Sequence, residues 1–449
     1  MASQTSTFSL HAATSDSRSG DILVFALPFL QFVQFNIIGV LFASDLLFIV
    51  TFCFLILSGK IRSTTPLSRR FIHLCGFWLA SQCFTDVVLR SDFTDYSRGW
   101  SKILFTVVNF CVLYTLLYGR PRRLLLYGWG LVAGLALTFL FSPDWHAIDY
   151  PWKFGMAYPT TLAVFLLASC RKGLGYAAVT MGVMIGVINI AEGARSRGGV
   201  CLATAFYLVI TAILRRLGGG TIRLKTKWIL AAAASLVLGC AGIIPIYEYA
   251  TSSGILGADA KDELEMQSSG QFGLLLGGRS AIFGSFPAIY DSPFIGHGSW
   301  ARDPTYVLMQ LALMAQVGYE NADTADEDAK NDYLIPAHSY IFGAWVEAGI
   351  IGALFWGWVL LFTLRTLWLF YPARIVITPL ASFGAFTLAW DLVFSPYGAE
   401  ARLVTPYYVV MMMTCWQMAG HKMSNSAAGI AKKELILDLP SDHSAESNG

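Results

Sequence analysis

The apolar residues of this chain come in long blocks that short polar stretches separate. A helix needs about 20 apolar residues to cross a bilayer, and blocks of roughly that size fill most of the sequence. They show no period-two alternation, which excludes an outer-membrane β-barrel and leaves helices to satisfy the backbone in hydrocarbon. We therefore expect an all-α integral membrane protein of about twelve transmembrane helices. The expected helices span residues 22–39, 45–58, 71–89, 103–118, 124–142, 154–169, 174–191, 199–214, 228–246, 340–364, 375–394 and 403–420.

Polar segments divide these helices into groups. Residues 1–20 form a polar N-terminal segment, and residues 21–246 hold helices one to nine. One large polar loop, residues 247–337, precedes helices ten to twelve at residues 338–420. The last residues, 421–449, are polar, and we expect them to be a disordered tail.

The start of the chain leaves one point open. The first two expected helices form a single apolar stretch interrupted by Asn36 and Asp45, so one broken helix and two short helices are both possible. Residues 1–20 lack the basic-then-apolar order of a cleaved signal peptide. We therefore expect the first span to be retained.

Composition supports lipid as the solvent. The chain is 55% hydrophobic and 13% charged, whereas soluble domains carry about 25% charged residues. A net charge of +2 without a long basic cluster argues against nucleic acid as a partner. All eight cysteines lie in or beside apolar spans, so we expect buried small side chains there rather than disulfides or a metal site.

The basic residues predict the orientation of the helices. Lysines and arginines collect in alternate short connections, and such connections face the cytoplasm in membrane proteins. Both termini are then expected in the cytoplasm and the large loop outside. The basic connections lie at residues 60–70, 120–123, 171–172, 215–227, 365–374 and 422.

Some arginines lie on the opposite, outward side. Arg195 and Arg197 stand in a short glycine-bearing turn, residues 192–199, that joins two apolar spans. Arginine forms two-pronged hydrogen bonds with phosphate oxygens, so this turn could hold a lipid diphosphate. Snorkelling to lipid headgroups, or pairing with Glu192, is the alternative.

The large loop contains a second candidate anion site. Arg279 precedes a mildly apolar stretch, residues 281–290, whose Phe283, Phe286 and Ile289 recur at helical spacing. This pattern predicts a short helix on the membrane surface, which Ser292-Pro293 would end. Gly296 and Gly298 then permit a tight turn. Arg279 could bind a phosphate, or it could neutralise a helix end or a headgroup.

Two ionisable residues mark the tenth expected span. His338 opens the span, and a histidine with a pKa near 6.5 can take a proton from a hydroxyl. A capping or interfacial histidine is the other interpretation. His146 looks interfacial, while His297 could line the same site as His338. Glu347 lies inside the apolar span, where a carboxylate needs a partner. It could orient His338 or an arginine, or bind a neighbouring helix.

Four motifs around these residues resemble the O-antigen ligase and polymerase superfamily of bacterial surface-polysaccharide enzymes. The resemblance covers residues 173–364, and the first five spans carry only a generic apolar signal. The motifs are Ser196-Arg197-Gly198, Gly278-Arg279-Ser280, the stretch from Asp291 to Gly298, and His338-Ser339 leading into the stretch from Glu347 to Gly352.

The resemblance implies a specific reaction. In that family a glycan moves from undecaprenyl diphosphate to a sugar hydroxyl at the periplasmic face of the bacterial inner membrane, without a metal or cofactor. It implies that Arg197 and Arg279, with Arg195 as an addition, bind the diphosphate leaving group. His338 would activate the acceptor hydroxyl, and Glu347 would support the site. The acceptor is lipid A-core for a ligase and a growing polysaccharide for a polymerase, and the sequence leaves both open.

Two other classes of function remain. A polytopic transporter or flippase would show inverted repeats and discontinuous helices near the midplane. The sequence shows no clear repeat, and its candidate polar residues gather at the outer edge. A lipopolysaccharide-binding scaffold without catalysis is the third possibility.

Overall fold

The computed structural model describes residues 18–62, 64–170, 175–218, 281–316, 333–370 and 377–437, together with a few isolated positions. The expected ninth span, residues 228–246, lies outside the described residues, as do Arg279 and the two ends of the chain. Every other expected span contains a helix, although the first also includes β1 and the tenth is divided between two helices. The protein is therefore a helical membrane protein, while the count of twelve stays a prediction.

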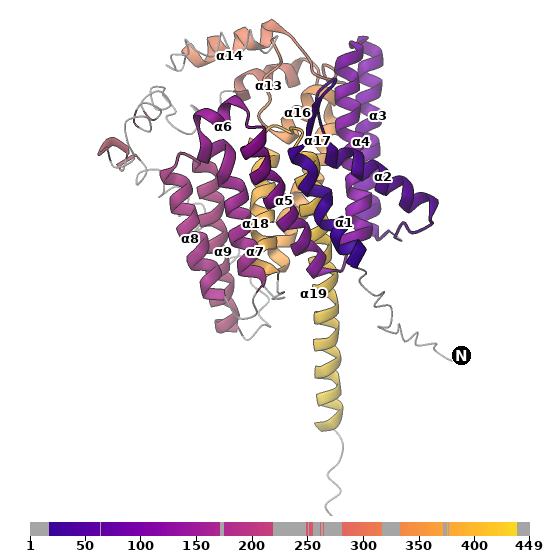
Figure 1. Ribbon diagram of the computed structural model, residues 1–449, viewed down its shortest axis with the longest axis vertical. Helices are drawn as coiled ribbons and strands as arrows, with labels where there is room; N and C mark the ends of the chain where they lie inside the picture. Colours follow the sequence, from indigo (N-terminus) through magenta and orange to yellow (C-terminus); the bar gives the residue numbers. More distant parts are fainter. Residues whose placement is uncertain are drawn as a thin grey trace, which may run out of the picture.

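The first part of the bundle contains α1 to α5 and a short β-hairpin (Figure 1). These elements are α1 (Arg18–Phe29), the 3-10 helix η1 (Leu30–Phe32), β1 (Gln34–Asn36), β2 (Val40–Phe42), α2 (Ala43–Leu57), α3 (Pro66–Leu89), α4 (Phe93–Leu117) and α5 (Pro121–Phe141). The middle part comprises α6 (Trp145–Asp149), the π-helix η2 (Pro151–Met156), α7 (Ala157–Cys170), α8 (Gly175–Ala191) and α9 (Arg195–Gly218). The last part comprises α13 (Ala281–Asp291), α14 (Pro304–Gln316), α16 (Tyr340–Ala348), α17 (Ile350–Leu369), α18 (Thr378–Phe394) and α19 (Ala401–Leu437).

Six helices are long and apolar enough to cross a membrane, counted over the described residues alone. They are Pro66–Leu89, Phe93–Leu117, Pro121–Phe141, Pro151–Cys170, Arg195–Arg216 and Ile350–Leu369. Three shorter apolar helices accompany them, at Ala43–Leu57, Tyr176–Ala191 and Thr378–Phe394.

The bundle has two distinct ends (Figure 1). We call the end that carries α6, α13 and α14 the loop end; α9, α16 and α19 begin there. At the opposite end α1 begins and α19 leaves the bundle. The first and last helices thus reach the same end of the bundle. The charge pattern likewise predicts that the two termini lie on one side of the membrane.

The first two expected spans are separate helices. Between α1 and α2 the chain forms η1 and an antiparallel hairpin that pairs Gln34 with Phe42 and Asn36 with Val40. The Asp45 carboxylate accepts a hydrogen bond of 3.0 Å from the backbone N–H of Phe42. This bond satisfies a donor that the start of α2 leaves free, which fixes where the second helix begins.

The tenth expected span is broken in two. Gly349 has a φ of +67° and separates α16 from α17. A side chain there would overlap the carbonyl oxygen of Phe294, because the loop backbone passes directly over the break. The broken helix frees the carbonyls of Val346 and Glu347, which accept bonds from the N–H groups of His297 (2.6 Å) and Gly298 (3.1 Å). The apolar pattern alone predicted one continuous helix.

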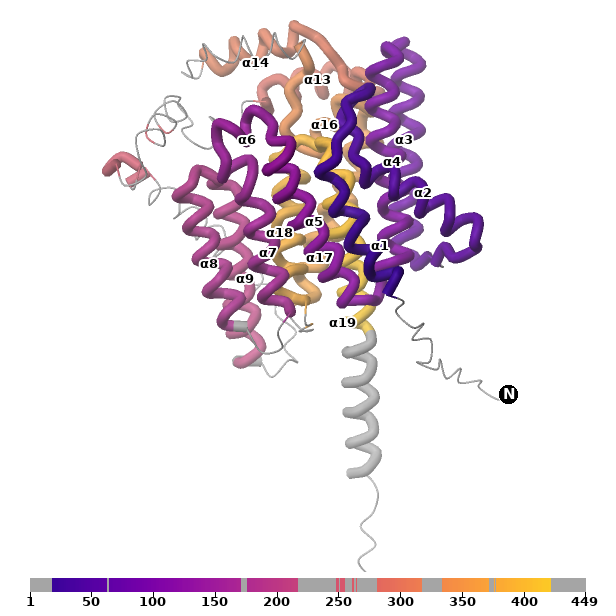
Figure 2. Tube along the Cα trace, in the orientation of Figure 1, coloured from indigo at the N-terminus to yellow at the C-terminus, as the bar shows by residue number. Residues whose placement is uncertain are grey.

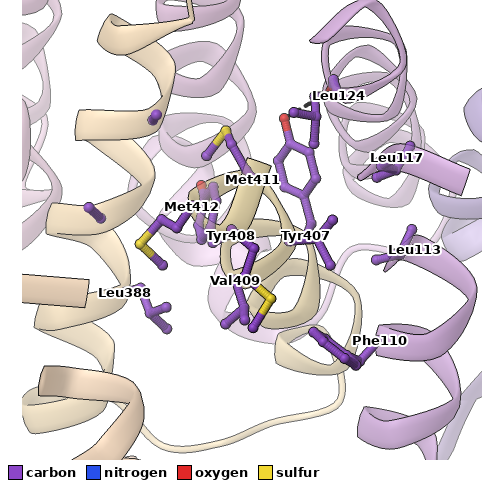
Figure 3. Packing of buried hydrophobic residues seen from close by; sticks show 14 of the residues in the cluster. Phe110, Leu113, Leu117, Leu124, Leu388, Tyr407, Tyr408, Val409, Met411 and Met412 are labelled. Atoms are coloured by element: carbon purple, nitrogen blue, oxygen red, sulfur yellow. Dashed lines mark hydrogen bonds between the residues drawn. The ribbon is translucent and has the colours of Figure 1, made fainter. Parts of the chain in front are cut away.

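The core surrounds α19. Figure 3 shows its residues Tyr407 to Met412 packed among side chains of α4, α5 and α18. The Tyr407 hydroxyl donates to the Leu124 carbonyl of α5 (3.0 Å), and Asn109 of α4 donates to the Arg402 carbonyl (2.9 Å). Polar bonds between helices thus fix α19 within an otherwise apolar interior.

A buried ion pair ties the hairpin region to α19. Arg402 contacts the Asp45 carboxylate at 3.0 Å, and the two side chains are 7% and 0% exposed. The same guanidinium donates to the carbonyls of Val40 (2.9 Å) and Ala399 (3.1 Å). Removing one member of such a pair leaves an uncompensated buried charge.

Replacing Arg402 with Ala is expected to destabilise the protein by about 3–5 kcal/mol, because the Asp45 charge would lose its partner. Thermal unfolding in detergent would measure the loss, followed with a thiol dye after the exposed Cys53 and Cys170 have been blocked, so that it reports the buried Cys75, Cys201 and Cys415. The control is Arg122→Ala, whose side chain is 72% exposed beside Asp21. Equal melting temperatures for the two variants would contradict the role given to the Arg402 pair.

Candidate functional site

The loop end brings together three of the predicted site residues. Arg195 and Arg197 lie in the first turn of α9, and His338 directly precedes Ser339, the N-cap of α16. Both helices begin at the loop end (Figure 1). His338 is exposed, whereas Arg195 and Arg197 are half-buried. Glu347 lies at the other end of α16.

The expected turn around Arg197 is helical. The chain turns at Gly193, whose φ is +77°, and α9 already starts at Arg195. Gly198 serves close helix packing, since a Cβ there would lie 2.7 Å from the Gly186 carbonyl of α8. Two residues apart on a helix, Arg195 and Arg197 do not point the same way.

Arg197 lies where four helices meet. Its guanidinium stacks 4.5 Å from the ring centre of Tyr158 on α7, and the Tyr158 hydroxyl bonds to that of Tyr408 on α19 (2.8 Å). Its charge also acts on Asp391 of α18, whose carboxylate accepts a bond from Ser395 (2.8 Å). The cation is thus held in one orientation at the positive end of the α9 dipole, where anions bind favourably.

The start of α16 is tied to the same region. Ser339 caps α16 by accepting from the N–H of Phe342 (3.2 Å) and donates to the Leu392 carbonyl of α18 (2.9 Å). The charges of Asp391 and Arg197 both act on the hydroxyl of Tyr340. His338, two residues before Tyr340, therefore lies at the same end of the bundle as Arg197.

Sequence reasoning missed Asp391. It is a carboxylate inside an apolar helix, and such residues in a membrane protein are costly unless they are partnered or functional. That signal, which singled out Glu347, could have identified Asp391 as well. Nothing in the sequence indicated that the charge of Arg197 would act on it.

Glu347 binds a neighbouring helix. Its carboxylate contacts the Lys102 ammonium of α4 at 2.5 Å, and the two side chains are 16% and 13% exposed. Its backbone carbonyl also accepts from Gln82 of α3 (3.4 Å). Of the two possibilities that the sequence left open, the structure shows the helix–helix contact; the partner is neither His338 nor an arginine.

The predicted loop helix exists as α13, which ends at Asp291. Its apolar residues are not equally buried, because Ile289 lies inside the protein while Phe286 is 52% exposed. Gly296 and Gly298 adopt φ values of +86° and +87°, as the predicted tight turn requires.

The two outward histidines have structural contacts. A ring nitrogen of His297 lies 2.7 Å from the Ala288 carbonyl of α13, and its ring packs edge-on against Tyr306 of α14. His297 thereby joins these two helices to the turn that covers Gly349. His146 stacks on Trp145, with ring centres 3.5 Å apart.

Asp86 anchors the loop segment that follows α13. Its carboxylate accepts four hydrogen bonds, from the Ser299 N–H (2.7 Å) and hydroxyl (2.7 Å), from Ser91 (2.8 Å) and from the Trp100 indole (2.8 Å). Arg302 continues the attachment through a two-pronged pair with Asp95, one contact of which measures 3.0 Å. This part of the loop is therefore fixed to the α3–α4 tip.

Carboxylates moderate the charge around Arg197. Glu400, in the connection between α18 and α19, has an exposed side chain, while the protein around it still reduces its hydration. Desolvation raises the pKa of its carboxyl, the nearby Asp144 carboxylate raises it further, and Arg197 opposes both. The region thus combines a fixed cation with oxygen acceptors suited to sugar hydroxyls. Among the described residues, no group of three or more His, Cys, Asp or Glu side chains could hold a metal ion.

Replacing Asp86 with Ala is expected to loosen residues 292–302, because four bonds to a charged group are lost. Each such bond contributes about 1.5–3 kcal/mol, so the Ser299 amide should exchange its hydrogen at least tenfold faster. Hydrogen-exchange mass spectrometry would measure this. Asp92→Ala is the control, since Asp92 is exposed and makes no side-chain cap at the start of α4. Unchanged exchange in Asp86→Ala would contradict the anchoring role.

Comparison with known proteins does not identify this chain. No protein-family model matches it, and no characterised protein matches its sequence. Arg197, in the first turn of α9, and His338, directly before the N-cap of α16, both lie at the loop end.

Proposed function

We propose that this protein is a membrane glycosyltransferase of the O-antigen ligase and polymerase type. It would move a glycan from undecaprenyl diphosphate to a sugar hydroxyl of lipid A-core or of a growing polysaccharide, at the periplasmic face of the bacterial inner membrane. One observation carries the proposal: the candidate anion-binding Arg197 and the candidate base His338 lie at one end of the bundle, each at the start of a helix.

Arg197 is suited to the donor. A diphosphate leaves an anomeric carbon readily when preorganised donors meet its growing negative charge. The Tyr158 ring orients the guanidinium before any ligand arrives, so little reorganisation is needed. Arg195, and Arg279 from the loop, would add further positive charge to the same leaving group in this proposal.

His338 is suited to the acceptor. The acceptor oxygen forms a bond with the anomeric carbon, the bond from that carbon to the diphosphate oxygen breaks, and the hydroxyl proton passes to the imidazole. Direct attack inverts the anomeric configuration. The diphosphate leaves as an anion and needs no acid, so a single base suffices, in contrast to glycosidases that use two carboxyl groups.

The broken α16–α17 helix does not favour a transporter. Discontinuous helices in transporters offer unwound backbone groups to a solute. Here the freed carbonyls of Val346 and Glu347 accept bonds from His297 and Gly298. The break holds the loop in place rather than lining a path.

Purified protein given a synthetic undecaprenyl-diphosphate glycan should transfer it to one of two acceptors, lipid A-core or a carrier-linked repeat unit. Arg197→Gln and His338→Ala are expected to reduce the rate by about 10²-fold or more, since each removes a group acting in the transition state. Product mass spectrometry measures transfer. Arg122→Gln and His146→Ala are the matched controls and should keep activity.

Transfer should persist in EDTA. Absence of product from the wild-type protein with both acceptors would overturn the proposed function. Full activity in His338→Ala would remove the proposed base, and strong inhibition by EDTA that a divalent ion reverses would remove the metal-free mechanism.

The raised pKa of Glu400 predicts a pH effect on donor binding. This pKa lies above the ordinary carboxyl value of about 4.5. As the pH rises through it, the carboxyl loses its proton and places negative charge beside Arg197. The donor KM should therefore rise roughly three- to tenfold across that range. Steady-state kinetics at varied donor concentration would measure it, separately from the effect of His338 on kcat.

Glu400→Gln should flatten this dependence of donor KM on pH. Glu192→Gln, which removes an exposed carboxylate at the same end, should leave it unchanged. A pH dependence that persists in Glu400→Gln would show that another group is responsible.

A further inference from the structure

A second arginine is preoriented at the loop end. Arg98 lies near the start of α4, and its Nε donates to the carbonyl of Ile38 in the hairpin turn. The guanidinium also lies 5.7 Å from the ring centre of Trp300 in the loop. Three segments far apart in the sequence therefore converge on one half-buried cation. Four of its five N–H donors have no hydrogen-bond partner among the described residues.

The carboxylates near Arg98 are already engaged. Asp95, one turn earlier on α4, gives both oxygens to Arg302. Glu347 pairs with Lys102, one turn later. Asp86 accepts its four bonds from Ser, Trp and backbone donors. Within the described part of the chain, Arg98 thus forms no ion pair and keeps its full charge.

Trp300 is held over this cation at a conformational cost. Its φ of +53° lies in the left-handed region, which a bulky side chain rarely adopts. The preceding Ser299 is bonded to Asp86, and Arg302 is bonded to Asp95, so the neighbours on both sides impose this conformation. The ring also lies 5.4 Å from the Lys102 ammonium. Such strain persists only where the surroundings fix it, and it clusters at functional sites.

Arg98 on α4 is separate from Arg197 on α9, but the two regions lie near opposite ends of α16. α4 and α9 stand on opposite sides of the bundle (Figure 2). α16 runs between the two regions. The charge of Arg197 acts on Tyr340 at the start of α16, and Glu347 near its end binds Lys102. The helix rises 1.5 Å per residue, so its ends are roughly 13 Å apart. His338 lies at the Arg197 end.

We propose that Arg98, backed by Trp300, binds a phosphate group of the acceptor glycolipid; this rests on the proposed function. Free guanidinium N–H groups match phosphate oxygens in pairs. The neighbouring Ile37 is 75% exposed, so the cation stands beside an apolar surface where a lipid anchor can lie. When its phosphate binds Arg98, an acceptor can place at His338 a sugar that is several units away from that phosphate. Both lipid A-core and a diphosphate-linked repeat unit have this chemistry.

The test compares Arg98→Gln with Arg90→Gln. Arg90 is exposed at the end of α3, at the same end of the bundle, and its replacement changes the charge equally. At saturating donor, Arg98→Gln should raise the acceptor KM by about tenfold or more and leave the donor KM unchanged. Arg90→Gln should change neither. Arg98→Lys, which keeps the charge without the two-pronged geometry, should fall between them.

Native mass spectrometry provides a readout that does not need transfer. Binding of lipid A-core, of the carrier-linked repeat unit and of phosphatidylglycerol is measured for each variant. Weaker binding of one glycolipid in Arg98→Gln alone supports the site and identifies the acceptor. Loss confined to phosphatidylglycerol, or equal behaviour of the Arg98 and Arg90 variants, overturns it.

The two failures can be told apart. If wild-type protein transfers to neither acceptor, the proposed function fails, and glycolipid binding still decides the Arg98 site. If wild-type protein transfers normally and Arg98→Gln keeps its acceptor KM, the site fails while the function stands. Melting temperatures of the variants within a few degrees of wild type confirm that each is folded.

Discussion

The pairing of charges inside an apolar bundle determines how this protein is assembled. A carboxylate in hydrocarbon is costly unless a cation meets it, and each pair observed here joins segments distant in the sequence. Asp45 meets Arg402, Asp95 meets Arg302 and Glu347 meets Lys102. The first pair joins the hairpin to the central α19. The other two join the loop and α16 to α4, so the polar loop is attached to the bundle and not merely inserted between helices.

Against this background, Arg197 and Arg98 at the loop end are informative, because neither forms an ion pair with one carboxylate among the described residues. Arg197 rests on an aromatic ring and shares its charge among several acidic groups, and Arg98 rests on a carbonyl and a strained tryptophan. In both cases the protein fixes the cation without neutralising it. A guanidinium fixed in this way is ready for an anionic ligand, because its orientation is already set when the ligand arrives.

The sequence predicts the helices well and the contacts between them poorly. The lengths of the apolar blocks located the spans. Pro293 and the glycines that follow it located the end of α13 and the turn after it. Periodicity could not show that Gly349 breaks a helix, because the cause is a loop backbone fifty residues earlier. Nor could it pair Glu347 with Lys102, 245 residues away. The roles of Arg197 and His338 remain predictions, and Arg279 lies outside the described residues.

The break at Gly349 makes the rest of the loop end possible. Because no side chain fits beneath the Phe294 carbonyl, the loop backbone can lie on the end of α16 and bond to its two free carbonyls. That contact places Ser299 against Asp86 and Trp300 against Arg98, while the other end of α16 places His338 beside the Arg197 region. Transfer between two bound molecules requires reacting groups held within a few ångströms of a productive geometry. A short helix fixed at both ends holds these residues in place, and a continuous helix at this position would have removed the loop's two bonds to the carbonyls of Val346 and Glu347.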